Sequence, residues 1–335
     1  MKKIRNNPDD LVLEMLQGYV EAHRNWFETI PGLQAFKKKT IDDKVIVMSN
    51  GGCGCEPMHI GYVGKGMGDA TCVGELFGAP SAYSIYETAK VIEKGKGIIL
   101  VCANFAGDYL NTDMAQELLQ IDGFKVEKIV VNDDITSAPK ENAEDRAGVA
   151  GIIFVLKILG AASEMGVNFE EMVRIGQKVK ESIYTISVVL YAGGLPQTGE
   201  IMFEIPDDKI EFGMGFNGEP GIRTTNMMSA DGMVDTAFNY LMEDMLLQQG
   251  DEVCVIVNSL GATTYMEQCV IFRKLAELTK SRGINIFDTK INRYLTSQEA
   301  GGFSITFLRL DQELKKYYEY PAYAPAFASF FPSDL

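Results

Sequence analysis

Apolar and polar residues alternate along the chain in blocks of strand and helix length. Three short apolar runs have the length of strands buried on both faces, at 44–48, 97–103 and 125–131. Stretches with apolar residues at helical spacing flank these runs, at 11–20, 82–94 and 114–120. Strands that alternate with helices in this way predict an α/β domain built on a mostly parallel sheet.

In the second half of the chain, a long stretch with helical spacing is followed by a second set of predicted strands and helices. Residues 145–183 have helical spacing almost throughout, with a break near 166–168. Further strands are expected at 185–191, 209–214, 252–258 and 303–310, and helices at 232–248 and 265–282. We therefore expect two α/β domains, 1–184 and 185–335, each with a largely parallel or mixed sheet flanked by helices.

Three loops follow predicted strands, at the positions where open α/β sheets bind ligands. They are residues 49–59, 103–111 and 215–223. The first contains NGGCGCEPMH and the third lies within GMGFNGEPGIR, so both carry a glycine-rich turn that ends in Glu-Pro. We expect a ligand cleft between loops of this kind, one from each domain.

Charge and composition exclude several classes of partner. The chain of 335 residues has 31 basic and 46 acidic side chains, a net charge of -15. Such a field repels nucleic acid and anionic membrane surfaces. The N-terminus lacks the apolar core of a signal peptide, and charges interrupt every apolar run before the roughly 20 residues of a membrane span. The sequence favours a cytoplasmic protein.

The two cysteines of the first loop, Cys53 and Cys55, allow three interpretations. Zinc sites use C-x2-4-C pairs and a second pair of ligands, whereas this loop has C-x-C and the other four cysteines are isolated. Redox pairs have C-x-x-C spacing. The third interpretation is that both are small packing residues in a glycine-rich turn. We expect free thiols and no metal.

Several long motifs carry a resemblance to a known family. They are GGCGCEPMHIGYVGKGM at 51–67, AGDYLN at 106–111, GMGFNGEPGIR at 213–223, NSLGAT at 258–263 and GFSIT at 302–306. In these motifs the chain resembles the substrate-binding subunit of the dihydroxyacetone kinases, and the resemblance extends over essentially the whole sequence.

The resemblance implies a site in which three side chains are replaced. The family uses a histidine of the third loop to hold the ketone as a hemiaminal, and Asn217 stands there. A carboxamide is not a nucleophile, so that covalent step is not available. The family's general acid/base histidine is Cys55 here, and Ala103 occupies the position of a lysine that contacts substrate.

What remains of the implied site is one carboxylate and a glycine backbone. Asp108 matches the family's catalytic aspartate and is expected to accept a hydroxyl proton. The amides of Gly52, Cys53 and Gly54 are expected to face the ligand. Cys55 stays a second catalytic candidate, provided that it carries enough thiolate. We interpret His59, in the same run, as structural.

Nucleotide is not expected on this chain. It has no Walker loop, and by resemblance ADP and magnesium belong to a separate helical subunit. ATP-dependent relatives carry that helical domain after the region matched here, whereas this sequence ends at Leu335. We therefore expect the type of subunit that draws phosphate from a phosphoenolpyruvate-driven phosphotransferase system, acting as a homodimer.

Three functional hypotheses follow. The first is a divergent kinase subunit that binds a short ketose or polyol without a covalent bond, with Asp108 as the base. The second is a catalytically silent paralogue that senses such a ligand and regulates a transcription factor. The third is a kinase subunit for a longer or acidic sugar derivative, in a site enlarged by the loss of the histidine and lysine side chains.

Overall fold

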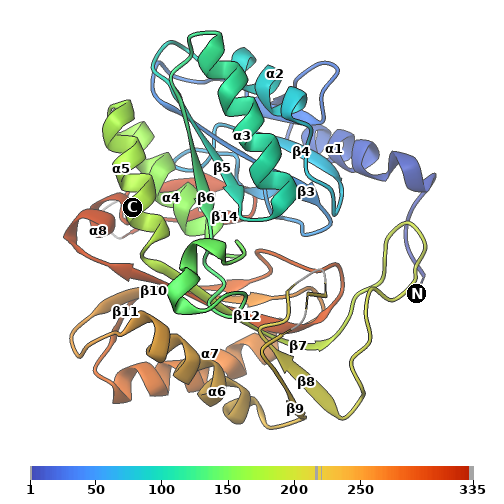
Figure 1. Cartoon of the computed structure of the whole chain (residues 1–335), viewed down its shortest axis with the longest axis vertical. Helices are drawn as coiled ribbons and strands as arrows, with labels where there is room; N and C mark the ends of the chain where they lie inside the picture. Colours follow the sequence, from blue (N-terminus) through green and yellow to red (C-terminus); the bar gives the residue numbers. More distant parts are fainter. Residues whose placement is uncertain (1, 216–217, 220, 332–335) are drawn as a thin grey trace. The chain divides into compact units, whose positions relative to one another are not determined.

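The chain folds into two compact units in the computed structural model, which describes residues 2–215, 218–219 and 221–331 (Figure 1). The first unit comprises Arg5–Val131, Ile152–Glu181 and Gln312–Leu335. The second unit comprises Met1–Ile4, Asn132–Gly151 and Ser182–Asp311. The division expected at residue 184 lies close to the crossing after Glu181, and the chain also crosses between the units after Val131, Gly151 and Asp311.

The first unit contains a six-stranded sheet in the order β1-β2-β4-β3-β5-β6. Its strands are β1 (Phe27–Thr29), β2 (Ala35–Lys38), β3 (Ile46–Cys53), β4 (Ala70–Leu76), β5 (Ile98–Ala103) and β6 (Val126–Val131). The four strands from β4 to β6 run parallel, and β1 and β2 are antiparallel. The three predicted strands are confirmed as β3, β5 and β6, and β3 continues into the glycine-rich loop.

Helices cover this sheet and fix its core. They are α1 (Leu11–Ala22), α2 (Ala82–Ile92), α3 (Ala106–Ile121), α4 (Ile152–Glu164), α5 (Phe169–Lys180) and α8 (Gln312–Tyr318), with the 3-10 turns η1 (Pro8–Asp10) and η2 (Ile60–Tyr62) and the hairpin β13 (Ala322–Ala324) and β14 (Phe327–Ser329). Side chains of α2 and α3, such as Ile85 and Leu119, pack on Met48 and Leu100 of the sheet. The helices α4 and α5 lie along its other side (Figure 1).

The start of α3 differs from the sequence prediction. The helical spacing predicts a helix from residue 114, but α3 begins at Ala106 with Phe105 as its N-cap. Asn104 and Gly107 give this segment the composition of a loop. Its backbone nevertheless turns helical three residues after β5. Asp108 therefore lies in the first turn of a helix rather than in a loop.

The second unit contains a mixed sheet in the order β11-β10-β12-β7-β8-β9. The strands are β7 (Ile183–Tyr191), β8 (Lys209–Phe212), β9 (Arg223–Asn226), β10 (Glu252–Ser259), β11 (Asn285–Asn292) and β12 (Gly301–Leu310). Only β10 and β11 pair in parallel within the described part of this sheet. The helices α6 (Ala230–Met245) and α7 (Tyr265–Ser281) pack on it through Phe238 and Leu275 (Figure 1).

The segment before β7 is less helical than predicted. Within 145–183, α4 and α5 are separated at Gly166 as expected. Residues 146–151 are not helical, and they follow the short 3-10 turn η3 (Lys140–Asp145). Among the described residues, no helix is long and apolar enough to cross a membrane.

Candidate functional site

The first loop and Asp108 belong to the same edge of the first sheet. Strands β3 and β5 are parallel neighbours, with Ser49 level with Val101. Their carboxyl ends therefore open at one edge, where ligands bind in sheets of this kind. The glycine-rich segment continues β3 at this edge, and α3 starts three residues after β5. The topology thus brings together two of the three predicted loops.

One face of α3 directs Asp108 towards the sheet. Asp108, Thr112, Ala115 and Leu119 recur at helical spacing, and the last three are fully buried. The side-chain amide of Asn50, at the end of β3, donates to Thr112 Oγ1 over 2.8 Å. This hydrogen bond joins the strand to the helical turn that follows Asp108. Asp108 is consequently held on the inner side of α3.

The environment of Asp108 suits a proton acceptor. Its Oδ1 is buried and has no hydrogen-bond partner among the described residues. Burial raises the pKa of the Asp108 carboxyl from its ordinary value of 3.8 to about 7, because the charged form loses hydration. A base is most effective when its pKa lies near the working pH. Asp108 meets this condition at neutral pH.

The glycine-rich loop is shaped by close contacts that only glycine permits. A Cβ atom added to Gly51 would lie 2.1 Å from Nε2 of His59. Gly54 has a φ of 108°, in the region that favours glycine, and its amide donates to Glu56 Oε1 over 2.8 Å. Glu56 thus fixes the turn, and the Gly54 amide that was expected to face a ligand is engaged with it.

The side chain of His59 packs against the backbone of this loop. The residue is buried, its backbone has a φ of 63°, and its ring lies against the backbone of Gly51. Burial lowers the pKa of the His59 imidazole to about 4, so the ring is neutral at physiological pH. A neutral ring packed against the loop backbone agrees with the structural role that we expected.

The cysteines of the loop are buried and protonated. The Cys55 thiol donates to the carbonyl oxygen of Gly52 over 3.6 Å. Burial, followed by the nearby charges of Glu56 and Asp108, raises the pKa of Cys55 well above its ordinary range. Burial likewise raises the pKa of Cys53. A protonated thiol is neither a base nor a nucleophile, which leaves Asp108 as the reactive group of this edge.

The structure describes Ala103 and the cysteines but not Asn217. Ala103 ends β5, half-buried, and its methyl group offers no polar contact at the edge. Asn217 lies outside the described residues. The six cysteines are unpaired. The described residues contain no group of three or more His, Cys, Asp or Glu side chains that could hold a metal ion.

The order of motifs and the geometry of this edge agree with a comparison to known families. Residues 17–326 match the Dak1 domain. The chain belongs to the Dak1 family. Two Dak1 relatives are the dihydroxyacetone-binding subunits of the PTS-dependent dihydroxyacetone kinase 2 of Listeria innocua and of the PEP-dependent dihydroxyacetone kinase of Escherichia coli. The first is 37% identical, covering 98% of this chain and 99% of the relative. The second is 33% identical, covering 97% and 99%.

The Dak1 fold is also found in a regulatory protein. A solved structure described as a dihydroxyacetone kinase operon co-activator superposes with a TM-score of 0.89. The two sequences are 29% identical, and the match covers 95% of this chain and 98% of the co-activator. Two classes of protein, kinase subunits and a co-activator, therefore share the Dak1 architecture.

Sequence reasoning missed the residues that hold Asp108 in place. Asn50 and Thr112 form the buried hydrogen bond described above, and neither belongs to a motif that carries chemistry. One signal was present in the sequence, since Asn50 places a polar amide at the end of an apolar strand. Its partner on α3 was not predictable, because the first turns of α3 read as a loop.

Proposed function

We propose that this Dak1 chain is the acceptor-binding subunit of a dihydroxyacetone-type kinase. It binds a short ketose or polyol, and Asp108 accepts the proton of the hydroxyl group that attacks the phosphate. The observation that carries the proposal is the half-buried Asp108 with a carboxyl pKa near 7 at the ligand-binding edge of the sheet. Its matching position in the AGDYLN motif supports the same role.

Phosphoryl transfer demands little covalent chemistry from the acceptor side. The protein has to position the hydroxyl group, neutralise charge and provide a base. The chain can therefore act even though, by the resemblance, Asn217 replaces the family's hemiaminal histidine. We infer that the ligand is held by hydrogen bonds alone, and that selection for ketones over polyols is weaker than in a subunit that forms the covalent bond.

The phosphate is delivered by a second protein in this proposal. The relatives in Listeria innocua and Escherichia coli are named as subunits of PTS- or PEP-dependent kinases, which supports the same division of labour here. A helical subunit with bound ADP and magnesium is the expected donor, and the Dak1 chain is expected to act as a homodimer. A net charge of -15 makes nucleic acid an unsuitable direct partner.

A second function is favoured by a specific observation. The co-activator superposes on 95% of the chain, and the resemblance implies that Cys55, Ala103 and Asn217 replace three side chains of the family's site. A protein that senses a small ketose or polyol and acts on a transcription factor needs loops that bind the ligand. It does not need a catalytic base. The similarity over nearly the whole chain to dihydroxyacetone-binding kinase subunits gives the kinase the stronger support.

Reconstitution distinguishes the two functions. The chain is combined with a helical ADP-carrying subunit and its phosphate donor, and dihydroxyacetone, erythrulose and glycerol are offered as acceptors. Formation of a phosphorylated product, absent when the chain is omitted, is the expected result. Measurable calorimetric binding of one of these compounds with no product from any of them would contradict the kinase and support the sensor.

A further inference from the structure

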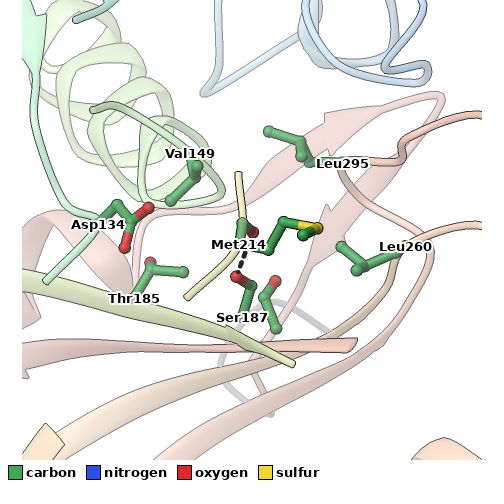
Figure 2. Close-up of a pocket in the computed structure, with 8 residues that line it drawn as sticks. Asp134, Val149, Thr185, Ser187, Met214, Leu260 and Leu295 are labelled. Carbon is green, nitrogen blue, oxygen red and sulfur yellow. Dashed lines mark hydrogen bonds between the residues drawn. The ribbon is translucent and has the colours of Figure 1, made fainter. Parts of the chain in front are cut away.

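The cavity beside Asp134, Ser187 and Met214 in the second unit is too small for an organic ligand (Figure 2). Its volume is about 20 Å³, which is room for about one water molecule. The Ser187 hydroxyl donates to the carbonyl oxygen of Met214 over 2.7 Å, so this side chain is engaged within the fold. A larger feature that the proposed reaction does not use lies on the surface of the first unit.

The outer face of α3 exposes a stripe of large apolar side chains. Leu110, Met114, Leu118 and Ile121 recur at helical spacing on this face. Leu110 is 60% exposed, Met114 56% and Ile121 80%. The opposite side of α3 is the apolar face that packs on the sheet and carries Asp108. Apolar residues on both sides are typical of a helix that is covered on both sides.

The neighbouring helix α2 extends this apolar surface. Tyr83 and Val91 of α2 are exposed as well. The two helices pack against each other on the same side of the sheet (Figure 1), and the Asn111 side-chain amide donates to the carbonyl oxygen of Pro80, just before α2, over 2.9 Å. Contiguous exposed apolar residues on adjoining elements mark an interaction surface. We call this surface the α2–α3 patch; it consists of Tyr83, Val91, Leu110, Met114, Leu118 and Ile121.

The α2–α3 patch begins at the edge of the sheet where Asp108 lies. Leu110 follows Asp108 within the first turns of α3. Both α2 and α3 start after the carboxyl ends of β4 and β5, which run parallel in the sheet. In the proposed reaction, the phosphate has to come within bonding distance of the hydroxyl group that Asp108 activates. The protein that carries the phosphate therefore lies over this edge, beside the first turns of α2 and α3.

Charge makes a second copy of the chain a poor occupant of the patch. Glu117 is exposed on α3, one helical turn from both Met114 and Ile121. A symmetric contact would bring Glu117 of both copies, and two chains of net charge -15, to one interface. A different protein with basic side chains beside an apolar face would pair with Glu117 instead. The stripe on α3 suits a helix of that protein, because ridges of one helix pack into grooves of another.

We propose that the α2–α3 patch is the docking surface for the helical subunit that delivers the phosphate, which contacts it through an apolar helix face flanked by basic side chains. This inference rests on the proposed function and adds the surface through which the two subunits meet. Burial of Leu110, Met114 and Ile121 provides the affinity. Glu117 favours the correct orientation and a fast association.

Methionine methyl signals locate the contact without requiring turnover. The full chain is labelled with ¹³C at methionine methyl groups, and the signals of Met114 and Met266 are assigned with Met114→Leu and Met266→Leu. The helical ADP-carrying subunit of the reconstituted kinase is then titrated. Met266 is 79% exposed on α7, in the second unit, and is the control. The Met114 signal should shift saturably, whereas the Met266 signal should not move.

Turnover of variants tests the same contact. Met114→Glu places a charge in the patch and should raise the concentration of ADP-carrying subunit that gives half the maximal rate about tenfold. The maximal rate and the KM for the acceptor should stay close to those of the wild type, because Asp108 is untouched. Glu117→Lys should raise the same concentration, most strongly at low salt. Met266→Glu should behave like the wild type.

The outcomes separate the docking surface from the proposed function. If the wild type forms no product with any acceptor, the proposed function fails and the docking surface fails with it. If product forms but the Met114 signal does not move, or a folded Met114→Glu has wild-type kinetics, the function stands and the docking surface is wrong. Sedimentation of the chain alone tests the other occupant: a wild-type dimer that Met114→Glu converts to a monomer would make the patch a contact between copies and overturn the proposal.

Discussion

Asn50 at the end of β3 donates its side-chain amide to Thr112, one helical turn beyond Asp108 on α3, over 2.8 Å. Both residues are completely buried. Because Thr112 and Asp108 share the inner face of the helix, this bond ties the strand that leads into the glycine-rich loop to the helix that carries the carboxylate. A polar contact outside the proposed chemistry therefore helps to position Asp108.

Removing that contact should destabilise the protein. Asn50→Ala leaves the Thr112 hydroxyl buried without its donor, and we expect a loss of about 1–3 kcal/mol in the free energy of unfolding. Urea denaturation followed by circular dichroism measures it. Gln17→Ala, on the exposed side of α1, is the control and should stay within about 0.5 kcal/mol. Equal stabilities of the two variants would show that the bond does not hold the site.

The sequence predicts the layers of this fold better than the details of its site. The strands β3, β5 and β6 contain continuous apolar runs of strand length. Such runs are readily predicted as strands buried on both faces. The strand β4 (Ala70–Leu76) was missed because its small and polar residues, including Gly74, lack a clear period. The first two turns of α3 were missed because the capping segment at 104–107 resembles a loop. Asp108 became a candidate through its motif, whereas its burial and its raised pKa required the three-dimensional contacts.

The thiols offer a direct check on the buried loop. Five of the six cysteines are buried, and Cys269 on α7 is exposed. A thiol reagent added to the native protein should modify one cysteine rapidly, whereas unreduced protein in denaturant should show all six. Cys269→Ser should abolish the rapid phase. Rapid native modification of Cys53 or Cys55 would mean that the loop is open and that their thiolates are accessible.

Burial of Asp108 should cost stability at alkaline pH. The folded-state pKa of Asp108 is about 7 and exceeds the ordinary 3.8. At pH values between these two, the folded protein therefore keeps a proton on Asp108 that the unfolded chain has lost. Stability from this group is present at low pH and is lost as the pH rises towards 7. Asp108→Asn should therefore be more stable than the wild type at pH 8, by roughly 1–2 kcal/mol after discounting for partial solvent access.

The pH dependence of this difference is the informative part. Thermal unfolding of both proteins between pH 4 and pH 8 should show the gap narrowing as the pH falls, because Asp108 becomes protonated in both states. Asp207→Asn, at an exposed position of the second unit, should show no comparable gap. A gap that is constant with pH would mean that the carboxylate of Asp108 is not desolvated.

The position of Asn217 predicts that dihydroxyacetone does not become covalently attached. Intact-protein mass spectrometry after incubation with excess dihydroxyacetone, with and without borohydride, should show only the unmodified mass. Asn217→His supplies an imidazole nucleophile at the position that the resemblance assigns to the family's histidine, and it is the matched comparison. A stable mass increase in the wild type that maps to 215–223 would contradict non-covalent binding.

The central claim is that Asp108 is the base of a phosphoryl transfer, and its most direct test is the turnover of Asp108→Asn in the reconstituted kinase. Loss of a positioned base typically lowers the rate 10²–10⁴-fold. Because the isosteric amide keeps most hydrogen bonds, ligand affinity should change by less than about tenfold, or roughly 1.4 kcal/mol. Asp113→Asn, on the same helix but paired with Lys128, should retain wild-type turnover. A turnover that survives Asp108→Asn would contradict the account.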